Sequence, residues 1–458
     1  MNPSQAMEEE AVDRISSLPK EIRISILCRL EIKDSVRTSA LAKSWRHLWT
    51  LLPRLRLGCY LDRLGYPPSR GFPPPLAPSL WIKRVHHLVS SLRGPLLDFE
   101  LSHYFRVGQS PLLQSVLDLL LQKGGGGGGG GVHSFTFSSH HGFPKYHDCV
   151  LLHLPSFPSL KQLTLYGCRI LLPPGFPGFP HLTTLKLQNV FIFNDDLNLL
   201  INPSYNLTTL VMLDCASPKN PLSVNISLPL LTHLEFQINK YIKKVSVNSA
   251  PCLEEARISV EEIEVGDDSR LQKLARVTLG LLTSVAMVTS LCLDNSAFKY
   301  LSVCTLPISF TFPRLRRLKL LLSIAFMDKR MCDVFLWLLR SMPFLEELEW
   351  ESLHSTWTES DAVLMRELFL KRQDGLSCLD QTLKRVTMNM IIWDVMTSTT
   401  VVKFFLLNAN VLELMKIVNW SSEVEASMIE ELQKAKVTCS NAKVVICFRK
   451  EDVTINFK

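Results

Sequence analysis

The segment LKQLTLYGCRILLPPGFPGFPHLTTLKL, residues 160–187, contains two copies of one hexad, L-x-x-L-x-L, whose first leucines lie 22 residues apart. The hexad recurs with conservative substitutions at 207–212 and 231–236, and more weakly at 253–258. It returns at 315–320 and 345–350, while its register between residues 260 and 305 is ambiguous. A fixed period of this length predicts one structural unit per repeat.

The period resembles that of leucine-rich repeats. Alternate apolar residues in each hexad predict a short strand with one buried face, and the intervening residues return as a loop or helix. Stacking such units side by side gives a solenoid whose strands form one parallel sheet. The predicted fold class is therefore α/β, with a curved leucine-rich-repeat solenoid carrying a parallel sheet on its concave face.

The x positions of the hexads alternate with the leucines, so their side chains are expected on the concave face. That face is the usual recognition surface of a solenoid. Its side chains are polar and mixed in sign, which favours a protein target over a nucleic acid. The candidate target-binding residues are Gln162, Thr164, Thr184, Lys186, Thr209, His233, Glu235, Arg317, Lys319, Glu347 and Glu349.

Residues 13–57, DRISSLPKEIRISILCRLEIKDSVRTSALAKSWRHLWTLLPRLRL, predict three short helices. Ile22, Ile26 and Leu30 give the first helix an apolar stripe. The second begins near Asp34 and carries Val36 and Ala40 inward, and the third runs through Leu41, Trp45, Leu48 and Trp49 until Pro53. So small a domain hides only about 60% of its unfolded surface, so a partner should cover the surplus.

The order of residues 13–49 resembles the F-box of plant F-box proteins along its whole length. The resemblance implies binding to a Skp1-like adaptor, which connects the F-box to a cullin–RING ubiquitin ligase. The motif residues for adaptor binding are Leu18, Pro19, Ile22, Ile26, Leu27, Leu30, Val36, Leu41, Trp45 and Trp49. Lys20, Arg23 and Glu31 depart from the usual pattern. Arg23 is expected to weaken binding if its charge lies near the contact face.

The chain divides into four predicted segments. The F-box covers 13–57, a proline-rich linker 58–80, the repeat solenoid 81–380 and a C-terminal cap 381–458. Eight consecutive glycines at 124–131 predict a surface loop within the solenoid. The cap resembles the FBD region that closes many plant F-box leucine-rich-repeat proteins. Its hexads start at Leu383 and Leu412, and residues 401–407 predict a helix between them.

Composition narrows the remaining classes of function. The net charge is +7, but the basic residues are dispersed and alternate with leucines around Arg317, so nucleic-acid binding is not expected. Residues 277–293 are uncharged, yet two buried strands joined by a turn explain them better than a membrane span. The twelve cysteines form no CxxC pair, which favours free thiols in the cytosol or nucleus.

No catalytic constellation is recognisable. The cluster of His140, His141, His147, Cys149 and His153 matches no zinc spacing and predicts a His-rich surface loop. Adjacent carboxylates at 195–196, 261–262 and 267–268 are expected in solvated turns. We expect no cofactor, no metal and no enzymatic activity.

The sequence thus predicts the substrate-recognition subunit of an SCF-type (Skp1–cullin–F-box) ubiquitin ligase. Its partners would be the Skp1-like adaptor, the cullin–RING ligase and an unknown protein substrate, without nucleic acid or membrane. The alternative is a non-degradative leucine-rich-repeat scaffold or ligand receptor.

Overall fold

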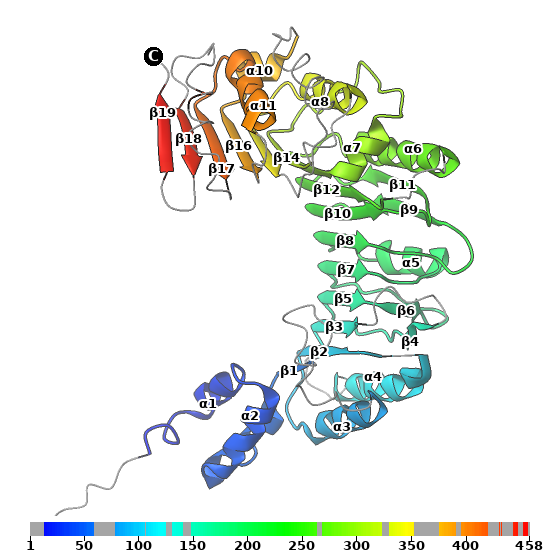
Figure 1. Ribbon diagram of the computed structural model, residues 1–458. Helices are drawn as coiled ribbons and strands as arrows, with labels where there is room; N and C mark the ends of the chain where they lie inside the picture. The colour runs from blue at the N-terminus through cyan, green and yellow to red at the C-terminus, as the bar shows by residue number, and fades with distance from the viewer. Residues whose placement is uncertain are drawn as a thin grey trace, which may run out of the picture. The chain divides into compact units, whose positions relative to one another are not determined.

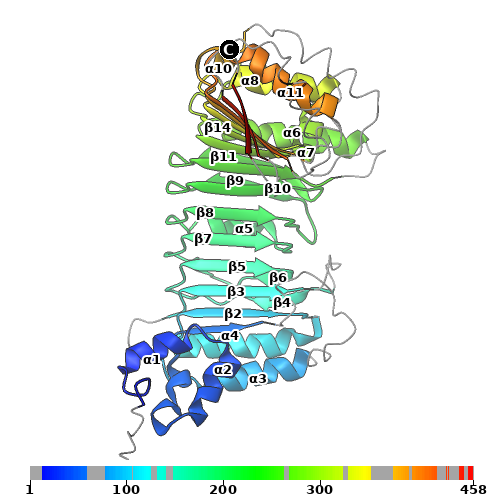
Figure 2. The same ribbon diagram turned by 60° about the vertical axis from the view of Figure 1, so that its left-hand side comes forward.

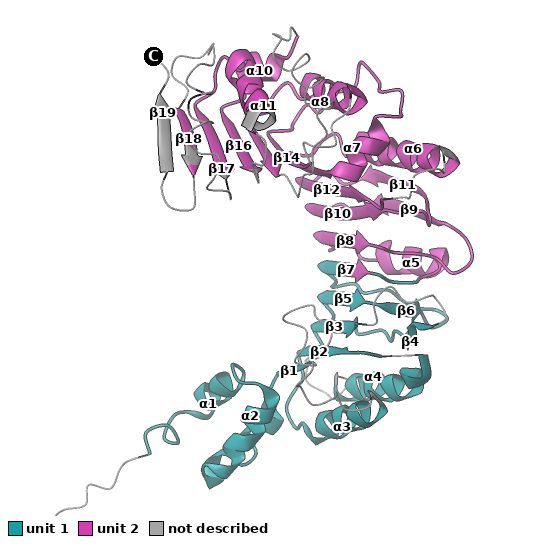
Figure 3. Cartoon of the chain, viewed as in Figure 1, with its two compact units in different colours: residues 1–185, 189–191 teal, residues 186–188, 192–458 magenta. Residues whose placement is uncertain are grey.

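Each leucine hexad forms one strand in the computed structural model of the chain. The structure describes residues 13–58, 78–105, 107–124, 131–140, 148–262, 268–322, 329–351, 375–390, 395–419, 430, 432, 443–447 and 452–456. The chain forms two compact units, residues 1–185 with 189–191 and residues 186–188 with 192–458 (Figure 3). Most of the proline-rich linker and the glycine run lies outside the described residues.

Unit 1 begins with the F-box and continues into parallel strands. Its elements are α1 (Lys20–Leu27), α2 (Ile32–Arg37), the 3-10 turns η1 (Thr38–Ala40), η2 (Lys43–Trp45) and η3 (Leu48–Leu51), β1 (Arg54–Leu57), α3 (Pro78–Ser91), β2 (Asp98–His103), η4 (Val107–Gln109), α4 (Ser110–Gly124), β3 (Ser134–Ser139), β4 (Val150–His153), β5 (Gln162–Tyr166) and β6 (Cys168–Leu171). Strands β1, β2, β3 and β5 pair in parallel, in that order. A second small sheet joins β4 to β6.

Unit 2 contains the longer run of strands, after β7 (Thr184–Gln188), which spans the unit boundary. Its elements are α5 (Asn194–Ile201), β8 (Thr209–Leu213), β9 (Leu222–Ser227), β10 (His233–Ile238), β11 (Ile242–Ser249), β12 (Glu255–Val260), α6 (Asp268–Ser284), β13 (Ser290–Asp294), α7 (Asn295–Leu301), β14 (Arg317–Leu321), α8 (Lys329–Ser341), β15 (Glu347–Glu351), α10 (Ser377–Gln381), β16 (Arg385–Met390), α11 (Val395–Asn408), β17 (Leu414–Asn419), β18 (Lys443–Cys447) and β19 (Asp452–Asn456).

Strands β8, β10 and β12 to β18 pair in parallel, and β19 closes the run antiparallel to β18. Helices α6, α7, α8, α10 and α11 lie along one side of these strands, as Figures 1 and 2 show. In these views, none of the described helices of unit 2 lies on the other face of the strands.

The hexad leucines are the core of both units, as predicted. In unit 2, Leu210, Leu234, Leu291, Leu318 and Leu348 occupy one continuous row, and each is at most 1% exposed. The x positions between them point to the opposite face because side chains alternate along a strand. The strand register thus turns the sequence period into a buried apolar face and an exposed polar one.

The chain leaves several strands through a left-handed residue that the sequence supplies at the same repeat position. Gly167, Asn189 and Asp214 directly follow β5, β7 and β8, with φ of 68°, 53° and 50°. Glycine, asparagine and aspartate are the residue types that tolerate this conformation. At Gly167 a Cβ atom would lie 2.2 Å from the carbonyl oxygen of Ser139, so only glycine fits there.

Three expectations for secondary structure were wrong. Residues 277–284 belong to α6, and only 290–293 form a strand, because a leucine spacing compatible with a helix continues from Leu274 through Leu281. The third predicted F-box helix consists of the turns η2 and η3. Asp195 and Asp196 lie in the first turn of α5, where carboxylates complement the helix dipole.

Helix α7 begins at a buried carboxylate. Asp294 Oδ1 accepts a hydrogen bond from the backbone N–H of Ala297 at 2.8 Å, and Oδ2 accepts one from Val260 at 3.1 Å. Burial raises the pKa of Asp294 from its usual 3.8 to about 6, although these hydrogen bonds favour the charged form. The folded state therefore holds this proton over a pH range in which the unfolded chain has lost it.

We expect the contribution of Asp294 to stability to be full below about pH 4 and to be lost as the pH rises through 6. The free energy of unfolding of Asp294→Asn relative to wild type should therefore rise between pH 4 and pH 7, by up to about 3 kcal/mol. Urea unfolding of both proteins at several pH values measures this difference. A difference that is constant with pH would contradict the raised pKa.

Candidate functional site

The F-box hides part of its apolar surface and exposes the rest. Leu27, Trp45, Leu48 and Leu52 form its buried core. The indole N–H of Trp45 donates a hydrogen bond to Ser16 Oγ at 2.7 Å, so the tryptophan is anchored inside the domain. The exposed apolar surface that the sequence predicts therefore comes mainly from aliphatic side chains, because Trp45 is buried and Trp49 is half-buried.

Ile22, Ile26 and Leu30 recur every fourth residue and lie outside this core. Their exposed fractions are 49%, 37% and 43%, which is high for large aliphatic residues. We call these three residues the F-box apolar face. Leu41 is also exposed, at 70%. An exposed stripe of this kind, next to a complete small core, is typical of a protein-binding surface.

The structure separates the predicted adaptor-binding residues into two groups. Leu27 and Trp45 belong to the buried F-box core. Pro19, Ile22, Ile26, Leu30 and Leu41 are exposed, whereas Leu18, Val36 and Trp49 are half-buried. The adaptor-binding role of all ten residues stays a prediction. Ala40, expected inside, is exposed, and Ser35 is buried in its place because its hydroxyl donates to the Leu27 carbonyl.

Arg23 turns toward the body of the F-box. Its guanidinium lies 5.7 Å from the centre of the Trp45 ring, and Nη1 donates to the carbonyl oxygen of Ser44 at 3.1 Å. Because the charge rests on Trp45, it does not lie within the F-box apolar face. The effect of Arg23 on adaptor binding stays a prediction.

A second candidate surface lies on the exposed face of strands β12 to β16 in unit 2. A hollow of about 320 Å³ opens there. The residues that line it are Glu255, Arg257, Ser290, Cys292, Arg317, Leu318, Lys319, Glu347, Leu348, Glu349, Arg385 and Thr387. We call it the charged hollow.

Side-chain length explains why the sheet is hollowed at this point. On β13 the two outward positions hold the short side chains of Ser290 and Cys292. The register places Ser290 between Glu255 and Arg317, and Cys292 between Arg257 and Lys319. Four long charged side chains therefore surround two short ones. The floor of the hollow is β13, and its walls are β12 and β14.

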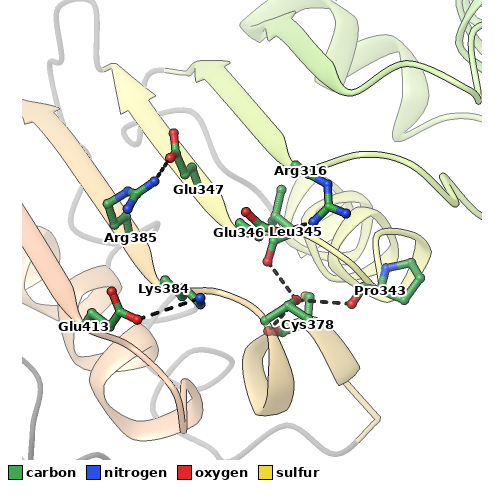
Figure 4. Close-up of polar contacts among 10 residues, drawn as sticks. Arg316, Pro343, Leu345, Glu346, Glu347, Cys378, Lys384, Arg385 and Glu413 are labelled. Carbon is green, nitrogen blue, oxygen red and sulfur yellow. Dashed lines mark hydrogen bonds and ion pairs between the residues drawn. The ribbon is translucent and has the colours of Figure 1, made fainter. Parts of the chain in front are cut away.

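Charges of opposite sign face each other across neighbouring strands. Lys319 Nζ lies 2.9 Å from Glu349 and 3.0 Å from Glu351. Figure 4 shows the pair of Arg385 with Glu347. Just before the strands, Arg316 pairs with Glu346, and Lys384 Nζ lies 4.0 Å from Glu413. Such exposed pairs contribute about 0 to 1 kcal/mol each, so they orient side chains more than they stabilise the fold.

The β13 floor of the charged hollow holds a neutral thiol, and Lys319 on the neighbouring strand stays charged. Burial raises the pKa of the Cys292 thiol to about 11, although Arg257 and Lys319 act in the opposite direction. Burial alone would lower the pKa of Lys319, but the hydrogen bonds that its ammonium donates to Glu349 and Glu351 outweigh burial and raise that pKa. The hollow thus presents a thiol and a hydroxyl among basic and acidic side chains.

The structure gathers some of the predicted target-binding residues. Arg317, Lys319, Glu347 and Glu349 line the charged hollow. His233 and Glu235 lie beside it on β10, within ion-pair distance of Glu255 and Arg257. Outside the hollow are Gln162 and Thr164 on β5, Thr184 and Lys186 on β7, and Thr209 on β8.

Sequence reasoning missed Ser290, Cys292, Arg257 and Arg385. The segment VTSLCL, residues 288–293, is a hexad that begins with valine, so a search for leucine at the first position passes over it. Allowing Val at that position would have placed Ser290 and Cys292 on the exposed face. Arg257 and Arg385 are x positions of the weaker hexads.

Among the described residues, no group of three or more His, Cys, Asp or Glu side chains is arranged to hold a metal ion. His141 and His147 of the histidine cluster lie outside the described residues. Within the same described ranges, no helix combines the length and apolarity needed to cross a membrane.

Known proteins match this chain over two separate ranges. Residues 15–57 match the F-box domain, and residues 131–350 match the family described as FBD-associated F-box protein At5g56370, LRR repeats. Over these two ranges the chain is thus similar to F-box proteins with leucine-rich repeats of the FBD-associated type. The C-terminal segment 381–458 lies beyond both matched ranges.

Similar proteins come from Arabidopsis thaliana. FBD-associated F-box protein At5g44940 is 27% identical over 184 residues, which are 40% of this chain and 44% of that protein. F-box/FBD/LRR-repeat protein At1g13570 is 25% identical over 350 residues, 74% of this chain and 76% of that protein. F-box/LRR-repeat protein At3g26922 is 52% identical over 202 residues, 44% of this chain and 59% of that protein.

The position of Arg23 generates a test. Replacing Arg23 by Ala removes the contact with Trp45 and the hydrogen bond to Ser44, which should lower the local stability of the F-box by about 1 to 2 kcal/mol. Hydrogen exchange of peptides spanning α1 and η2 should speed up accordingly. Arg29→Ala, which removes an exposed arginine just after α1, is the matched control and should leave exchange unchanged. Equal exchange in both variants would contradict the inward placement of Arg23.

Proposed function

We propose that this chain is the substrate-receptor subunit of an SCF-type (Skp1–cullin–F-box) ubiquitin ligase. The observation that carries the proposal is the F-box apolar face. Fully burying a large aliphatic side chain contributes about 1.5 to 3 kcal/mol, so covering three that are roughly half-exposed favours association by a few kcal/mol. A Skp1-like adaptor is the partner that the F-box resemblance implies for this surface.

The F-box is joined firmly to the first repeat strand, which suits an adaptor. The carbonyl oxygen of Thr50 accepts hydrogen bonds from the backbone N–H groups of Arg93 at 2.7 Å and Gly94 at 3.1 Å. The approach is so close that a Cβ atom on residue 94 would lie 3.0 Å from Leu51 Cα. Strand β1 then follows directly and pairs with β2. A partner bound to the F-box would be held in a defined position relative to these strands.

Such a subunit needs no catalytic residue of its own. The repeat face would hold a protein target, and the adaptor would hold the ligase, so the chain raises the local concentration of target near the charged ubiquitin enzyme. Most of the described cysteines are buried, and no disulfide joins two of them, which supports a reducing compartment, the cytosol or the nucleus.

The first test removes the F-box apolar face. The double variant Ile22→Asp, Ile26→Asp places two charges on that face without touching the buried core, so retention of a co-expressed Skp1-like adaptor should fall at least tenfold. The matched control is Leu199→Asp, which replaces an exposed leucine on α5. The proposal fails if wild type does not retain the adaptor, or if the double variant retains it as well as the control does.

The second test concerns degradation. Proximity labelling with the wild-type chain and with the double variant should capture the same targets, because the repeats are unchanged. On proteasome inhibition, those targets should accumulate at least about twofold with the wild type only. If proteasome inhibition changes the target amounts equally in cells with the wild-type chain and in cells with the double variant, the result would instead support a non-degradative scaffold.

A further inference from the structure

The charged hollow contains one cation that its neighbours leave without a partner. Among the described residues, Glu347 pairs with Arg385, Glu349 with Lys319, and Glu255 with His233. The guanidinium of Arg317 makes no ion pair and no hydrogen bond with any residue that the structure describes. All three glutamates of the hollow thus have a described side-chain partner, whereas Arg317 has none.

A second donor in the hollow is also unsatisfied. Arg257 Nη1 lies 3.7 Å from Glu235, a loose contact, and its buried Nε has no hydrogen-bond partner among the described atoms. Buried polar groups normally have partners, and a donor without one destabilises the fold. Arg257 on β12 and Arg317 on β14 flank the short side chains of β13. Arg257 and Arg317 therefore border the same space.

The chemistry of this space favours an anionic group. Guanidinium donors bind carboxylates and phosphates in a two-pronged geometry, and these charge-assisted hydrogen bonds are the strong ones in proteins. A cationic ligand would have to displace an existing side-chain contact to reach a glutamate. The volume of about 320 Å³ is at the lower end for ligand pockets, which suits one side chain better than a larger molecule.

We propose that the charged hollow recognises one anionic side chain of the target protein, a carboxylate or a phosphorylated hydroxyl, which binds Arg317 and completes the hydrogen bonding of Arg257. This proposal rests on the proposed function, because it names the chemistry of the target that the receptor selects. Ser290 and Cys292 leave room for the side chain, and the ion pair with Glu349 orients Lys319 on the β14 wall.

The test uses the full chain, purified with its Skp1-like adaptor, and a set of immobilised peptide pools. In each pool one central position is fixed as Glu, phosphoserine, Gln, Ala or Lys, and the flanking positions are mixed. Wild type should prefer the Glu pool, the phosphoserine pool or both over the Gln pool, by roughly tenfold. Whichever anionic pool binds more tightly identifies the source of the charge.

Variants of the hollow decide the outcome. Arg317→Ala should abolish the preference for anionic pools, and Arg317→Glu should replace it by a preference for Lys. Arg314→Ala is the matched control, because it removes an exposed arginine three residues away that does not line the hollow. It should keep the wild-type preference. No anionic preference in wild type, or the same preference in Arg317→Ala, would overturn the proposal.

Adaptor retention, measured on the same samples, separates the two proposals. If the adaptor is lost while the anionic preference depends on Arg317, the ligase role fails and the specificity of the hollow stands. If the adaptor is retained but the peptide pools show no preference, the opposite holds. Thermal unfolding of each variant shows whether the substitutions alter the fold.

Discussion

Parallel strands stacked in register are the constraint on which the rest of this molecule depends. Because equivalent hexad positions align from strand to strand, each position becomes a row across the sheet. Leucines in the inward rows bury one another and form the core. Side chains in the outward rows lie about 4.8 Å from their neighbours, close enough that charge and size must be matched between repeats.

Most of the fold could be predicted from the sequence, because in-register stacking requires apolar residues to recur at a nearly fixed period. All nine hexads that were recognised became strands, including those at Leu383 and Leu412. The period says nothing about the segments between strands, where leucines can line a helix as well as a strand. Residues 277–284 show this: the apolar spacing fits the buried side of α6, and only tertiary packing selects the helix.

The F-box shows which part of a candidate site a motif can and cannot predict. The motif identifies apolar positions, but it does not say which of them the domain needs for its own core. Leu27 and Ile26 are adjacent, yet one is buried and the other exposed, since neighbouring helix positions face different directions. The side chain of Arg23 also needed the structure, because its position depends on Trp45, 22 residues further along the chain.

The charged hollow arises where the repeat departs most from its own pattern. On β14 and β15 the outward positions hold long charged residues of opposite sign, such as Lys319 opposite Glu349, and on β12 they hold Glu255 and Arg257. On β13 the same positions hold Ser290 and Cys292, in the hexad whose first residue is valine. Short side chains there cost little stability, because the buried leucines of β13 remain in place. The short side chains instead leave an open space beside Arg317. Core packing does not determine which residue stands at this position, so recognition of a target can determine it.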